Sequence, residues 1–240
     1  MLTLLLLWNE FLSSITRKSL QKFKHITVEE YKLLEFLAEE EDGADFVSIN
    51  LSIWSPMERA IVLGDAEIVR LLIQKYRHYG INVNIPNCLH FTPLTYAIDK
   101  GQLKIIELLI NSAANVNLKD DYGWTPLTMA ILNGNINVIT LLLQSGADIN
   151  LVDGNDQTPI LTAIVNQRVE ALKVLIKYGA DVNFKPANVP TTPLLEAVQT
   201  NDPEIVKLLI SNGANNHNSF ELAMSTNQIS LLKTVLYPHF

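Results

Sequence analysis

The residues best suited to nucleophilic chemistry are the single cysteine of this 240-residue chain, Cys88, and His90, two positions later. A cysteine is activated when a nearby histidine takes its proton and a third group orients the imidazole ring. Residues two apart on a turn seldom align in this way, and the segment offers no evident third group. We therefore expect this pair to belong to a surface turn rather than to a catalytic site.

Carboxylates offer a second candidate for chemistry, because two neighbouring acids can act as general acid and general base. Asp120, Asp121, Asp153 and Asp156 cluster near expected turns, at recurring places along the chain. An aspartate side chain often accepts hydrogen bonds from the backbone of its own turn. We interpret these aspartates as turn residues and expect no catalytic pair.

The composition narrows the remaining classes of function. The sequence contains no phosphate-binding glycine-rich loop, no H-E-x-x-H motif and no paired-cysteine metal spacing, so we expect no enzyme, no cofactor and no metal site. The net charge of −7 argues against a nucleic-acid partner. No stretch reaches the ~18 apolar residues of a spanning helix, and the start lacks the features of a cleaved signal peptide.

An internal repeat indicates which structural units hold these residues in place. Thr-Pro pairs begin at Thr92, Thr125, Thr158 and Thr192, with intervals of 33, 33 and 34 residues, and a Ser-Pro variant begins at Ser55. A second marker precedes each of the four Thr-Pro pairs by 12 or 13 residues, as in GADIN before Thr158. Two markers in register indicate stacked structural units.

This pattern resembles the ankyrin repeat, which has a 33-residue period and a T-P-L-H-x-A signature. The resemblance extends from about Ser55 to the end of the chain. It implies an all-α solenoid of helix-turn-helix units with β-hairpin-like fingers. One departure is that the histidine of the signature is replaced in every unit, so we expect less tightly braced turns. The replacing residues are Glu58, Thr95, Thr128, Leu161 and Leu195.

One unit shows why each residue suits its place. Thr125 can cap a helix by accepting an orphan backbone N–H, and Pro126 suits the first helical position. Ala130 lets two helices approach closely, and Gly134 can end the first helix in the left-handed conformation. The corresponding residue of the next unit, Gln167, tolerates that conformation poorly and is a candidate weak point.

We expect two parts of the chain: a helical N-terminal cap at 1–54 that includes a degenerate first repeat, and an ankyrin repeat domain at 55–240. The latter would contain about five repeats and a shortened C-terminal capping repeat. The apolar start is expected to fold onto the stack, although contact with a partner or membrane is an alternative. Four extra residues near 74–80 predict a second helix longer by one turn, with a loop bulge as the alternative.

The residue before each Thr-Pro pair bears on function. Trp124 corresponds to Trp54, Phe91, Gln157 and Thr191, and such unlike side chains favour the surface over the interior. Equally open is that Trp124 packs on the neighbouring finger and stiffens it. In ankyrin proteins, finger tips and the exposed face of the first helix form a concave binding surface. By position, the resemblance implies these partner-binding residues: Phe91, Asp99, Lys100, Lys119, Asp121, Tyr122, Trp124, Leu132, Asn133, Asn155, Gln157, Val165 and Asn166.

The expected function is that of a non-catalytic module that binds a protein partner, whose identity the sequence does not give. We expect a monomer; the alternative is a structural scaffold that self-associates through its apolar N-terminal end. The Asn-, Ile- and Lys-rich composition resembles ankyrin proteins of intracellular bacteria, some of which act as effectors inside host cells. The expected location is therefore the cytoplasm or, after export, a host cell.

Overall fold

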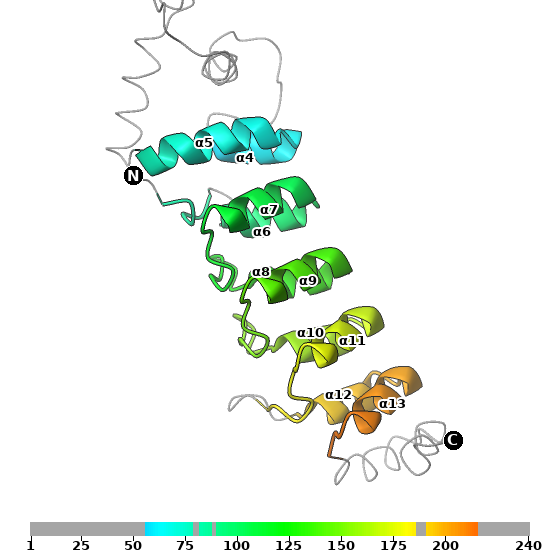
Figure 1. The fold of residues 1–240 in the computed structure, drawn as a ribbon. Helices are drawn as coiled ribbons and strands as arrows, with labels where there is room; N and C mark the ends of the chain where they lie inside the picture. Colours follow the sequence, from blue (N-terminus) through cyan, green and yellow to red (C-terminus); the bar gives the residue numbers. More distant parts are fainter. Residues whose placement is uncertain (1–55, 79–81, 88–89, 186–190, 216–240) are drawn as a thin grey trace, which may run out of the picture.

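The computed structural model describes residues 56–78, 82–87, 90–185 and 191–215. Within these ranges the chain is all-α, with no residue in a β-strand, and the helix labels begin at α4 as in Figure 1. The expected N-terminal cap and degenerate repeat at 1–54 lie outside the described residues. Most of the expected C-terminal capping repeat, from residue 216, lies outside them as well.

The helices form five antiparallel pairs that stack in one row (Figure 1). The first helices pack on one another in one layer, α4 on α6, α6 on α8, α8 on α10 and α10 on α12. The second helices form the other layer, and the connecting segments project from one side of the row (Figure 1). The pairs are α4 (Pro56–Leu63) with α5 (Ala66–His78), α6 (Pro93–Asp99) with α7 (Leu103–Asn111), α8 (Pro126–Leu132) with α9 (Ile136–Gln144), α10 (Pro159–Val165) with α11 (Val169–Lys177), and α12 (Pro193–Gln199) with α13 (Pro203–Ser211).

Threonine caps begin α6, α8, α10 and α12, as the sequence predicts. The Thr125 side chain accepts from the backbone N–H of Thr128 at 3.0 Å, and its hydroxyl also pairs with the Thr128 hydroxyl at 2.8 Å. In the next unit, Leu161 has no hydroxyl to offer, and the cap bond from its N–H to Thr158 is 3.4 Å long. Replacing the histidine of the signature therefore leaves a paired hydroxyl in one unit and a single, longer bond in the next.

The hydrophobic core runs without interruption between the two helix layers. The alanine at the sixth position of each unit is fully buried in all five pairs. This small side chain allows close approach of helices whose larger neighbours fill the interior. In α9, for example, Val138, Ile139 and Leu142 are buried. A helix pair alone would leave such a face in water, so each unit depends on its neighbours for stability.

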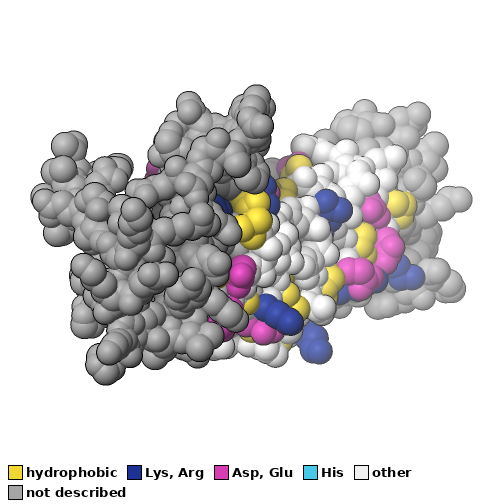
Figure 2. Space-filling view, turned by 90° about the horizontal axis from the view of Figure 1, so that it is seen from above, with side chains coloured by type: hydrophobic (Ala, Val, Ile, Leu, Met, Phe, Trp, Pro, Cys, Tyr) yellow, Lys and Arg dark blue, Asp and Glu magenta, His cyan; other side chains and the backbone are white. Residues whose placement is uncertain are grey.

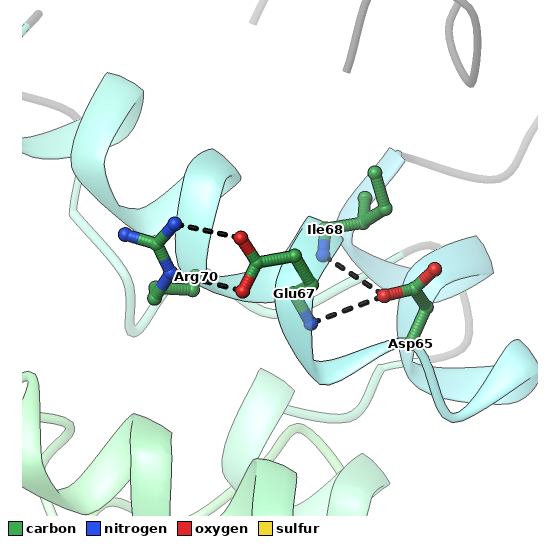
Figure 3. A network of polar contacts seen from close by, with 4 residues as sticks. All are labelled: Asp65, Glu67, Ile68 and Arg70. Atoms are coloured by element: carbon green, nitrogen blue, oxygen red, sulfur yellow. Dashed lines mark hydrogen bonds and ion pairs between the residues drawn. The ribbon is translucent and has the colours of Figure 1, made fainter. Parts of the chain in front are cut away.

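The extra turn predicted near 74–80 is present, because α5 has 13 residues whereas α7, α9, α11 and α13 each have nine. Tyr76 packs against the core from this turn. Burial, with a smaller contribution from the Glu58 carboxylate, raises the pKa of Tyr76 to about 12. At the other end of α5, Asp65 accepts from the N–H groups of Glu67 and Ile68 at 3.1 and 3.0 Å (Figure 3).

The turn after each first helix requires a left-handed residue. Gly134 has φ +68° after α8, whereas Gln167 has φ +53° at the corresponding place after α10. A side chain in this region costs about 1–2 kcal/mol, so the structure supports the prediction of a strained turn at Gln167.

Replacing Gln167 with glycine is therefore expected to raise the free energy of unfolding by about 1 kcal/mol. Urea denaturation followed by circular dichroism measures the change. The matched control is Gln199→Gly at the end of α12, where glycine replaces an exposed helical residue and should lower stability by ~0.5–1 kcal/mol. A loss of stability in both variants would contradict strain at Gln167.

Candidate finger surface

The segments between successive helix pairs, here called fingers, carry the candidate site. The second finger (114–124) and the third (147–157) are fully described, and the first (82–91) and fourth (180–191) are described in part. In the second finger, Asp120 Oδ1 accepts from the N–H groups of Tyr122 and Trp124 at 3.1 and 2.9 Å. Asp153 makes the same pair of bonds in the third finger, at 2.7 and 3.0 Å. The prediction that these acids serve their turns is confirmed for Asp120 and Asp153.

Asp120 is buried, and two opposing effects act on its pKa. Burial raises the pKa of its carboxyl above the ordinary value of 3.8 and outweighs the hydrogen bonds from Trp124 and Tyr122, which lower it. A raised pKa means that the folded chain binds this proton more tightly than the unfolded chain does. The contribution of Asp120 to stability is therefore full at pH values below 3.8 and declines as pH rises through the raised pKa.

We expect Asp120→Ala to destabilise the chain by ~1–3 kcal/mol at neutral pH, because two backbone N–H groups lose their acceptor. The difference in unfolding free energy between wild type and variant should grow as the pH is lowered from neutral towards 4. Urea titrations of both proteins at several pH values give this difference. The pH-dependent contributions of the other carboxylates to the unfolding free energy are largely the same in both proteins and cancel. A difference that shrinks on acidification would mean that the hydrogen bonds, rather than burial, dominate.

Hydrogen bonds between neighbouring fingers fix their spacing. The N–H of Asp121 donates to the carbonyl of His90 at 2.9 Å, and the N–H of Gly154 donates to the carbonyl of Gly123 at 2.8 Å. At the finger bases, Asn117 Oδ1 accepts from the N–H of Asp148 at 2.7 Å. The tips are therefore presented in a set arrangement before any ligand arrives, which reduces the entropy lost on binding.

Aromatic rings connect the tips of the first two fingers to helix α6. The ring of Tyr122 lies 5.3 Å from that of Phe91 and meets the His90 ring edge-on at 5.7 Å. Phe91 in turn stacks at 5.7 Å on Tyr96, which is buried in α6. We call Tyr122, Phe91 and His90 the aromatic platform; it has an exposed end at Tyr122, 52% of which is accessible to solvent.

Charged side chains border this platform. His90 Nδ1 lies 3.0 Å from Asp121 Oδ2, which joins adjacent fingers. At the end of α6, Lys100 Nζ pairs with Asp99 at 2.9 Å and lies 5.2 Å from the centre of the Tyr96 ring. Figure 2 shows one face of the stack, on which acidic and basic side chains lie close together and hydrophobic side chains form small separate patches.

The partner-binding residues expected from sequence divide into two groups by exposure. Those exposed to solvent are Asp99, Lys100, Lys119, Asp121, Tyr122, Asn133, Asn155, Val165 and Asn166. Those half-buried are Phe91, Trp124, Leu132 and Gln157. Asn133 also has a structural role, since its Nδ2 donates to the carbonyl of Ile98 in the preceding unit at 3.1 Å.

Trp124 packs against the hydrophobic core, whereas Tyr122, two residues earlier, projects from the tip. Its counterparts Phe91, Gln157 and Thr191 are half-buried too. Dissimilar side chains at this position therefore do not indicate full exposure, because all four are partly buried. Tyr122 is the stronger candidate anchor on this finger.

Sequence reasoning missed three exposed residues of this face. His90 belongs to the aromatic platform, although its sequence suggested only a turn. Ile85 is exposed on the first finger, and Val62 is exposed on α4 at the repeat position held by Leu132 and Val165. Because Val62 occupies the same repeat position as Leu132 and Val165, the sequence alone could have identified it as a candidate surface residue.

Few of the described residues bear on the alternatives of catalysis, metal binding or membrane insertion. Cys88 lies outside them, and His90 pairs with Asp121. Among the described residues, no group of three or more His, Cys, Asp or Glu side chains is placed to hold a metal ion. No described helix is both long enough and apolar enough to cross a bilayer.

A row of helix pairs that bury their apolar faces against one another and extend turns from one side defines a helical repeat protein. The family model "Ankyrin repeats (3 copies)" matches residues 78–153 and 145–220, which together make up more than half of the chain. The chain belongs to the ankyrin repeat family.

Comparison with solved structures supports the same fold. The chain is similar to the crystal structure of the ankyrin repeat domain of Bcl-3, described as a unique member of the IkappaB protein family. The two are 24% identical with a TM-score of 0.73, and the match covers 77% of this chain and 86% of that one. No match was found among curated proteins. Ankyrin repeats typically act in protein–protein interaction and are generally non-catalytic.

Proposed function

We propose that this chain is a monomeric module that binds a protein partner against its finger tips and the exposed side of its first helices. The main supporting observation is the solvent-exposed Tyr122 ring, held by Phe91 and His90 on fingers that are hydrogen-bonded to each other. Val165, 46% exposed on α10, offers a second apolar contact. An aromatic ring that is already fixed in place loses little side-chain freedom on binding and is a common anchor of interfaces.

Affinity capture tests this proposal. The full chain, immobilised, is compared with a Tyr122→Ala, Val165→Ala double variant and with a Tyr178→Ala control. Tyr178 is a suitable control because it is also an exposed tyrosine, at 38%, but lies at the end of second helix α11. Truncating a central anchor costs ~2 kcal/mol, so the double variant should lose its captured proteins while the control retains them.

Equal capture by all three proteins would reject the finger surface as the binding site. The self-associating alternative is examined separately by light scattering of the eluted full chain. A monomer gives 26.9 kDa, whereas a scaffold gives a multiple of this mass that increases with concentration.

A further inference from the structure

Charge is divided unequally between the two sides of the stack. The described residues of the four fingers contain six aspartates and two lysines, whereas the described side chains of the five second helices include four glutamates and six lysines or arginines. A ligand that approaches the fingers therefore meets a surface of the opposite sign to the one on the second-helix layer. Long-range electrostatics favours positively charged groups at the fingers.

The aromatic platform gives this general attraction a defined place. Tyr122 presents an exposed ring that Phe91 and His90 hold at fixed distances. A cation within ~6 Å of such a ring is attracted to its π-face. Next to the ring, Asp121 pairs with His90 through Oδ2 alone, which leaves Oδ1 to accept a further hydrogen bond.

Resting on the proposed function, we propose that the platform binds an arginine side chain in a basic segment of the partner protein. The guanidinium group is planar, so it can stack on the Tyr122 ring and at the same time donate to the Asp121 carboxylate. A lysine side chain bound at the same site would provide only a point charge. Lys119, the basic residue of this finger, is exposed.

The probe is a blocked, fluorescently labelled peptide in which arginine alternates with serine, titrated into the full chain and followed by anisotropy. Matched peptides carry lysine or glutamate in place of arginine. We expect the arginine peptide to bind several-fold more tightly than the lysine peptide and the glutamate peptide not to bind. When the arginine peptide is added, the amide chemical shifts of the protein should change in the first and second fingers and not along the second helices.

Three variants locate the site. Tyr122→Ala should weaken binding of the arginine peptide about fivefold, and Tyr122→Phe, which keeps the ring, should bind like wild type. Tyr178→Ala, on the opposite layer, should leave binding unchanged. The far-UV circular dichroism of each variant verifies that it is folded, and the comparison of arginine and lysine peptides on the wild-type chain remains decisive if Tyr122→Ala is perturbed.

The proposal is overturned if Tyr122→Ala binds the arginine peptide as wild type does, if arginine and lysine peptides bind equally, or if the shifts fall on the second helices. These outcomes differ from a failure of the proposed function. A chain that captures proteins in a Tyr122-dependent way but ignores the arginine peptide has a finger interface with a different partner chemistry.

Discussion

Replacing Gly123 with alanine is expected to lower the free energy of unfolding by at least ~3 kcal/mol. Two costs combine at this position. The backbone has φ +85°, where an alanine costs about 1–2 kcal/mol. The added Cβ would also lie 2.5 Å from the Cα of Gly154 on the next finger. Because the Cβ would meet backbone rather than the end of a flexible side chain, we expect the fingers to separate and the Gly154–Gly123 hydrogen bond of 2.8 Å to be lost.

Two other glycines separate these costs. Gly146 has φ +86°, but a Cβ there meets nothing within 4 Å, so Gly146→Ala measures the backbone cost alone. Gly154 has no left-handed backbone, but its Cβ would lie 2.7 Å from the Cα of Gly123. Gly154→Ala therefore measures the contact between fingers, including a hydrogen bond worth about 1 kcal/mol.

Urea unfolding of the three variants gives their losses, and hydrogen exchange of the second and third fingers shows where they arise. We expect Gly123→Ala to lose the most stability, and Gly123→Ala and Gly154→Ala to speed exchange in both fingers. If Gly123→Ala costs no more than Gly146→Ala, the two fingers do not touch in solution. In that case the tips of the second and third fingers would not be held at a fixed spacing.

The repeat architecture could be predicted from sequence because it depends on short-range chemistry. A threonine hydroxyl reaches the N–H three residues later, and proline suits the first helical position, so each Thr-Pro pair predicts a helix start. The extra turn of α5 followed from a four-residue surplus in one interval. The burial of the sixth-position alanines followed from their recurrence in every unit.

The arrangement of the finger tips could not be predicted in the same way. Tyr122 and Trp124 are two residues apart in one turn, yet one is exposed and the other packs on the core. Their roles depend on how closely neighbouring fingers approach, which the spacing of markers does not give. The platform joins Phe91 to Tyr122 across 31 residues. The raised pKa of Asp120 likewise depends on burial between units.

The apolar layer between units leads to the second large effect. Leu142 lies in the last turn of α9 and is fully buried, with 0% of the residue exposed. Leu142→Ala is expected to lower the free energy of unfolding by about 2–5 kcal/mol, the lost transfer energy plus the cost of the cavity. Because each unit is stabilised by its neighbours, the damage should not remain local: weakening the unit of α8 and α9 uncouples those on either side.

Equilibrium urea unfolding provides two readouts, the midpoint and the steepness of the transition. For Leu142→Ala we expect a lower midpoint and a shallower slope, because a stack divided in the middle no longer unfolds as one cooperative unit. Leu63→Ala is the matched control: the same substitution at a residue that is 64% exposed on α4 should change stability by no more than ~0.5 kcal/mol. If Leu142→Ala lowers the midpoint but leaves the slope unchanged, the neighbouring units still unfold together. The stack is then more cooperative than nearest-neighbour coupling through this layer requires. If the two leucines behave alike, α9 does not pack in solution as described.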